Sequence, residues 1–144
     1  MADLAASIQP PRLSQYLTAY PETLFSDELY RCCEGTDRYA LEWALELAAQ
    51  LELASALSQP RTAAEVHAHL RWSPSFRAAG AWLLRHLAAA DFLAVDDAGS
   101  ARHYRLSAPL PEAQRQDVRQ QCLAVSASTA ATLDLYDAAA GLYP

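Results

Sequence analysis

The feature that most constrains the fold is a helix that leads directly into a β-hairpin. Residues 83–91 (LLRHLAAAD) are rich in leucine and alanine, which is typical of a helix. Residues 92–95 predict a short strand, residues 96–100 (DDAGS) predict a turn, and residues 102–106 predict a second strand. The sequence therefore predicts a two-stranded hairpin directly after a helix.

Two helix start signals precede this hairpin. Thr62 is followed three residues later by Glu65, which matches a capping box, and this first helix is predicted to end near Leu70. Ser73 as N-cap and Pro74 at the first helical position start the second helix. Two helices joined by a tight turn and followed by a hairpin predict a winged-helix core.

Gly80 is predicted to lie in the middle of the second helix. A glycine there costs about 1 kcal/mol relative to alanine, so close approach of a neighbouring helix is the expected reason for it.

The segment before this core divides in two. Residues 1–36 contain Pro10, Pro11, Pro21 and Gly35, and predict an arm with short helices. These short helices are expected at LSQYLTAY (13–20) and SDELYRCC (26–33). Residues 37–57 contain no Gly or Pro and consist mainly of strong helix formers, so they predict one long helix.

The segment after the core, residues 109–144, predicts helices that become more apolar toward Leu142-Tyr143-Pro144. We expect these helices to lead into a catalytic domain that this chain lacks. The predicted fold class is mainly α, with flanking helices around the winged-helix core, in agreement with a composition that is 52% hydrophobic and poor in glycine. The predicted organisation is an N-terminal helical arm (1–36), a long helix plus winged-helix core (37–108), and C-terminal helices (109–144).

The long helix has an unusually wide apolar side. Its apolar residues cover about half of the circumference, whereas a helix on the surface of a single core needs an apolar stripe about 100° wide. Either this helix lies centrally within the domain, or another chain covers its second face. The candidate interface residues are Trp43, Leu47, Leu51, Ala54 and Trp82.

Charge argues against nucleic acid as the main partner. The net charge is −6, and all eleven basic residues are arginine. Residues 60–108 contain six arginines against four acidic residues, but the turn of the hairpin carries Asp96 and Asp97 where a DNA-binding wing usually places a cation. A winged-helix transcription regulator that binds DNA remains the alternative function.

The sequence contains neither a membrane span nor a signal peptide, which predicts a cytoplasmic protein. Cys32, Cys33 and Cys122 are expected to be reduced, buried thiols. His67 and His69 are two residues apart on a helix and cannot bind one metal ion together, so no metal site is predicted. No catalytic constellation of Ser-His-Asp, paired carboxylates or Cys-His is present in the sequence.

Several motifs nevertheless resemble a known family. TAAEV (62–66), AWLLRHLAAADFL (81–93) and YRL (104–106) resemble the N-terminal winged-helix region of class I S-adenosylmethionine-dependent O-methyltransferases, although Asp91 stands where that family usually has glycine. ALEWALELAAQLEL (40–53) and LDLYDAAAGLYP (133–144) are similar to the helical region that precedes the catalytic core in some polyketide-synthase methyltransferases.

The resemblance implies a non-catalytic role in secondary metabolism. In the family this region pairs two subunits or forms a lid over the active site, while the catalytic domain binds S-adenosylmethionine. The implied partners are the chain's own methyltransferase catalytic domain, a second copy in a homodimer, and an acyl carrier protein. The family's glycine-rich cofactor loop has no counterpart here, because the four glycines are isolated from one another, so no cofactor is expected in this chain and we do not expect it to be an enzyme by itself.

Overall fold

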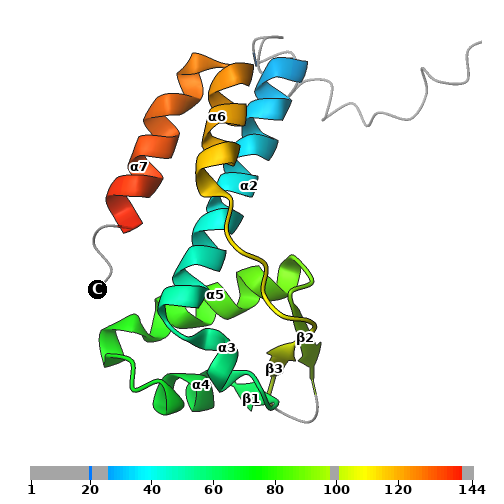
Figure 1. Ribbon diagram of the computed structural model, residues 1–144, viewed down its shortest axis with the longest axis vertical. Helices are drawn as coiled ribbons and strands as arrows, with labels where there is room; N and C mark the ends of the chain where they lie inside the picture. Colours follow the sequence, from blue (N-terminus) through cyan, green and yellow to red (C-terminus); the bar gives the residue numbers. More distant parts are fainter. Residues whose placement is uncertain (1–19, 21–25, 98–100, 141–144) are drawn as a thin grey trace, which may run out of the picture.

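A computed structural model of the chain describes residue 20 and residues 26–97 and 101–140 (Figure 1). The described part is mainly helical and contains a small antiparallel sheet. One long helix, α2, runs through most of the molecule; α6 and α7 lie along its upper half, and α5 crosses its lower half. The elements are α2 (Asp27–Gln50), α3 (Leu53–Ala56), β1 (Arg61–Thr62), α4 (Ala63–His69), the 3₁₀ turn η2 (Pro74–Phe76), α5 (Arg77–Ala89), β2 (Leu93–Asp96), β3 (His103–Leu106), α6 (Arg115–Val125), the 3₁₀ turn η3 (Ala127–Thr129) and α7 (Ala130–Ala140).

Helix α2 begins ten residues earlier than predicted. The Ser26 side chain caps it by accepting a hydrogen bond from the Leu29 amide at 3.2 Å, and two acidic residues in the first turn complement the helix dipole. The separate short helix predicted at residues 26–33 is therefore wrong, since these residues form the cap and first two turns of α2. Gly35 does not end the helix. A Cβ at this residue would lie 2.8 Å from the Cys122 sulfur, so the glycine allows α6 to pack closely against α2.

The prediction of one unbroken helix over residues 37–57 is also wrong. Glu52 adopts a left-handed conformation with φ of 53°, which ends α2 and redirects the chain into α3. The turn places Leu53 and Leu57 in the core, with at most 1% of either side chain exposed. Burial of these two leucines outweighs the cost of a left-handed glutamate.

The lower half of the molecule combines the helix pair α4–α5 with the sheet. The capping box predicted for α4 is confirmed: the Glu65 amide donates to the Thr62 hydroxyl at 3.2 Å, and the Thr62 amide donates to the Glu65 carboxylate at 2.7 Å. Ser73 and Pro74 mark the start of the next helix as predicted, but Ser73 makes no side-chain cap and bonds to the Ser75 hydroxyl instead. The first turn is therefore 3₁₀ before α5 begins.

The hairpin β2–β3 is present as predicted, but the sheet has a third strand among the described residues. β1 pairs antiparallel with β3, giving the order β1-β3-β2. Two residues are too short a segment for alternation to reveal a strand, so the prediction of a two-stranded sheet missed β1. A single lower core joins α2, α3, α4, α5 and the sheet through twelve buried residues.

The upper half consists of α2, α6 and α7, which share a second core formed by Tyr39, Val118, Cys122 and Leu133. Because α3, α5, α6 and α7 all contact it, α2 is the central helix of the molecule. Most of its wide apolar side is thus covered within the chain. No helix in residues 26–97 and 101–140 is long and apolar enough to cross a membrane, and the helix expected at residues 13–20 falls outside the described part except for Tyr20.

Candidate functional site

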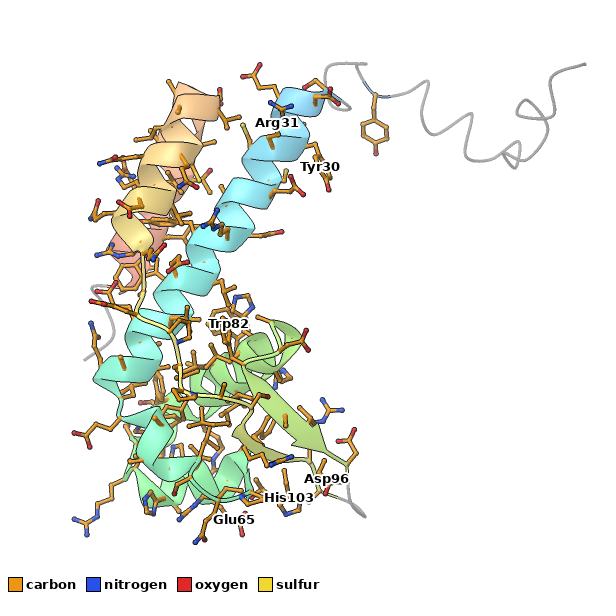
Figure 2. All side chains as sticks on the ribbon, turned by 45° about the vertical axis from the view of Figure 1, so that its right-hand side comes forward. Tyr30, Arg31, Glu65, Trp82, Asp96 and His103 are labelled. Carbon is orange, nitrogen blue, oxygen red and sulfur yellow. The ribbon has the colours of Figure 1, made fainter. Side chains whose placement is uncertain are left out.

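An apolar hollow of about 270 Å³ opens between α2, α5 and α7. We call it the tryptophan cleft. Trp82, which is 45% exposed, stands where α5 approaches α2 (Figure 2). The lining residues are Ala40, Trp43, Ala44, Leu47, Gln50, Trp82, Tyr136 and Ala139.

The three aromatic rings of the cleft are each held by a second group. The Trp43 indole N–H donates to Asp137 Oδ1 at 3.1 Å, and the Arg115 guanidinium lies over its ring at 4.1 Å from the centroid. The Trp82 ring is stacked on His86, with centroids 4.8 Å apart and planes 13° from parallel. The Tyr136 ring contacts Tyr39 edge to face, with centroids 6.3 Å apart.

A group of polar side chains, the Asp137 cluster, joins the three upper helices. It consists of Tyr39, Trp43 and Glu46 from α2, Arg115 from α6 and Asp137 from α7. Asp137 Oδ1 accepts from the Tyr39 hydroxyl at 2.5 Å, from the Trp43 indole N–H, and from Arg115 Nη1 at 2.8 Å. Arg115 also donates from Nε to Glu46 at 2.8 Å. One carboxylate oxygen thus fixes α7 to both neighbouring helices.

The ionisation of this cluster follows from its contacts. Burial raises the pKa of the Asp137 carboxyl, but the hydrogen bonds from Tyr39 and Trp43 and the positive charge of Arg115 outweigh it, so the pKa lies below its ordinary value. Burial and the hydrogen bond to Asp137 raise the pKa of the Tyr39 phenol. At neutral pH the cluster therefore contains an ionised aspartate, a protonated tyrosine and a charged arginine.

The five candidate interface residues do not lie on one surface. Trp43, Leu47 and Trp82 come together in the tryptophan cleft. Leu51 is half-buried against the lower core. Ala54 is exposed in a different groove, formed with residues 106 and 108–112, because the break at Glu52 turns α3 away from the line of α2.

The sequence patterns did not predict the contributions of α6 and α7 to the site. Tyr136 and Ala139 line the cleft, and Arg115 and Asp137 form the centre of the polar cluster. The sequence contains one signal for this contribution, a pair of acidic residues on α7. Asp134 and Asp137 interrupt a largely apolar helix, and such residues commonly mark a specific ion pair.

The β2–β3 hairpin and the helix before it carry a mixed charge pattern. Arg102 is paired with Asp97 by two hydrogen bonds of 2.8 and 3.3 Å, which neutralises the arginine nearest the hairpin turn. Asp96 is exposed beside them, in the same part of the sheet as His103 (Figure 2). Four further arginines are exposed and make no ion pair with a described residue: Arg71, Arg77, Arg85 and Arg105.

The cysteines and glycines fill packing roles where they are described. All three cysteines are free; Cys32 and Cys122 are buried as predicted, whereas Cys33 is exposed. A Cβ on Gly80 would lie 2.6 Å from the Trp72 ring, so the predicted close approach at this residue comes from a side chain in the α4–α5 turn and not from another helix. Because Gly35 and Gly80 both lie inside helices against such neighbours, they do not fit a cofactor-binding loop.

Within the described residues, no group of three or more His, Cys, Asp or Glu side chains is arranged to hold a metal ion. No protein-family model, curated protein or solved structure matches the chain.

Proposed function

We propose that this chain is a non-catalytic interaction domain of an S-adenosylmethionine-dependent methyltransferase, from polyketide or other secondary-metabolite biosynthesis. In this role it acts as a dimerisation, lid or adaptor unit beside the catalytic domain. The order β1–α4–α5–β2–β3 supports the interpretation of the lower half as a winged helix. The methyltransferase assignment rests on the sequence motifs, and the interaction role rests on the surface of α7.

The observation that carries the interaction role is the mismatch between the composition and the burial of α7. Apart from Thr132, Asp134, Asp137 and the phenol of Tyr136, its sequence AATLDLYDAAA is apolar, which is typical of a helix that is covered on most sides. Leu133 is nevertheless its one buried residue among those whose side chains are described, and Leu135 is 69% exposed. Ala131 and Ala138 extend the exposed apolar surface on both sides of Leu135.

The Asp137 cluster has a supporting part in this proposal. Its charged and hydroxyl groups bond to one another, so they position α7 and hold its outer side toward solvent. A second copy of the chain that presents the same surface would bury both copies of Leu135 around a two-fold axis.

Sedimentation equilibrium of the chain tests the dimer directly. We expect reversible dimers in the micromolar range that are lost in Leu135→Asp. They should be retained in Leu29→Asp, which places the same charge at an exposed leucine in the first turn of α2. A monomeric wild type at 200 μM (about 3 mg/ml), or equal behaviour of the two variants, would contradict the dimer. Methyl transfer from S-adenosylmethionine by this chain alone would contradict the non-catalytic assignment.

The four exposed arginines favour one alternative, DNA binding by the winged-helix segment. Arg77 and Arg85 lie on α5, the helix that would enter a major groove. The alternative predicts a nanomolar, salt-sensitive shift of duplex DNA that Arg85→Ala weakens, and binding only at micromolar concentrations would reject it.

A further inference from the structure

We propose that the tryptophan cleft is a binding site for a small, uncharged molecule of one or two rings with a single polar substituent. This inference goes beyond the proposed interaction role, because it assigns the cleft to a ligand and leaves the outer side of α7 to a protein partner.

The size of the cleft favours a small molecule as occupant. Ligand sites usually enclose roughly 300–1,000 Å³, and the volume of about 270 Å³ lies just below that range. An α-helix with its side chains is about 10 Å across, so a docking helix could insert at most a side chain into a hollow of this size, whereas a small molecule can lie wholly inside it. A compound of about a dozen heavy atoms fits it.

The walls are apolar and partly ordered before any ligand binds. Trp43 is held by Asp137 and Arg115, whereas Trp82 stacks on His86 and Tyr136 contacts Tyr39. Trp43 therefore needs little ordering when the ligand enters, and the ring contacts restrict Trp82 and Tyr136, which are 45% and 37% exposed; both effects lower the entropic cost of binding. Flat aromatic walls pack best against flat or compact apolar surfaces.

The charge pattern specifies an uncharged ligand. None of the eight lining residues is Asp, Glu, Lys, Arg or His, and the two charged residues that contact Trp43, Asp137 and Arg115, are bonded to each other. A charged ligand would lose its hydration without gaining a counter-ion. Gln50 is the lining residue with a carboxamide, and it can donate to or accept from one hydroxyl or carbonyl group.

Titration with 2-naphthol, followed by the indole N–H signals in ¹⁵N–¹H NMR spectra, tests the site. The chain has three tryptophans, and Trp72 provides an internal control because it packs against Gly80 and lies outside the cleft. Single Trp→Phe variants assign the three signals. We expect saturable shifts of Trp43 and Trp82 with a Kd on the order of 100 μM, little shift of Trp72, and at least tenfold weaker binding of anionic 2-naphthoate.

A matched pair of substitutions on α7 locates the binding. Ala139→Leu fills the cleft. Ala138→Leu adds the same side chain at the preceding residue, which does not line the cleft. Measured in the Leu135→Asp background, so that the proposed dimer surface around Ala138 plays no part, we expect at least tenfold weaker binding for Ala139→Leu and no change beyond twofold for Ala138→Leu.

Equal affinity of the two alanine variants, equal shifts of all three indoles, or no shift at 1 mM 2-naphthol would overturn the proposal. Leu135→Asp separates this test from that of the dimer, since it should abolish the dimer and leave 2-naphthol binding intact.

Discussion

The substitution Asp137→Asn tests whether one carboxylate holds α7 in place. Asparagine has nearly the shape of aspartate, so the amide oxygen can still accept from Tyr39 and Trp43. The change removes the negative charge that faces Arg115 at 2.8 Å. Arg115 retains its second partner, Glu46, so its guanidinium is not left alone.

The expected loss lies between two limits. Breaking a fully buried ion pair costs about 3–5 kcal/mol, and an exposed pair is worth about 0–1 kcal/mol. The side chains of Arg115 and Asp137 are 21% and 32% exposed, which places the pair between these limits. We expect Asp137→Asn to lower the free energy of unfolding by about 2 kcal/mol, a large part of the roughly 5–15 kcal/mol typical of a domain.

A matched control lies one turn away on the same helix. Asp134 also pairs with an arginine of α6, Arg119, at 2.6 Å, but its side chain is 63% exposed. Asp134→Asn should therefore cost about 0.5 kcal/mol or less. Urea unfolding at pH 7, followed by far-UV circular dichroism, measures the stability of both variants. Equal losses of stability would refute the argument that burial makes the ion pair of Asp137 contribute more than that of Asp134.

The same pair predicts a pH dependence. Because the folded-state pKa of Asp137 lies below its unfolded value, its contribution is complete above the unfolded pKa of about 3.9 and is lost as the pH falls through the folded pKa. The stability difference between wild type and Asp137→Asn should be constant from pH 7 to about pH 5 and shrink below about pH 4. A difference that grows on acidification would contradict the assigned direction of the pKa shift.

Three further outcomes can be checked with simple assays. Gly80→Ala should lower stability by about 1–2 kcal/mol in urea unfolding, because overpacking against Trp72 outweighs the gain in helix propensity, and it should become stabilising in a Trp72→Leu background. Leu133→Ala should cost about 2–5 kcal/mol in the same assay, since the leucine side chain is fully buried. The exposed Cys33 should react with a disulfide reagent well before Cys122, whose pKa is raised by burial; equal rates would show that α2 and α6 separate readily.

Local signals in the sequence predicted the lower half well. The capping box at Thr62 and the proline at residue 74 act over one turn of helix, and both mark helix starts in the structure. The alternation of Tyr104 and Leu106 likewise marked a real strand. Such signals depend on neighbours within about four residues, so the rest of the fold does not alter them.

The predictions that failed depended on contacts distant in sequence. Gly35 looked like a helix end, but its place opposite the Cys122 side chain makes it part of a helix interior. Leu51 and Glu52 looked like helix formers, but burial of Leu53 and Leu57 bends the chain there. The cleft could not be assembled from α2 alone, because two of its lining residues come from α7, about ninety residues later.

The position of Trp82 links the two halves of the molecule to the question of function. In a DNA-binding winged helix, the exposed side of the second helix must be free to enter a groove. Here the ring of Trp82 is stacked on His86 and lines a hollow shared with α2 and α7. One edge of the exposed side of α5 therefore already faces helices of the same chain. At the hairpin turn, Asp97 pairs with Arg102, and the exposed Asp96 makes no ion pair with a described residue, so its negative charge opposes contact with phosphates. Both features favour an interaction or ligand role over nucleic-acid binding. Asp96→Lys with Asp97→Lys reverses only the charge at the hairpin turn, and we expect it to give weak, salt-sensitive and sequence-independent binding to duplex DNA in fluorescence anisotropy, because the added lysines contact phosphates. Nanomolar, sequence-selective binding by that double variant would contradict this conclusion, because it requires α5 to enter a groove.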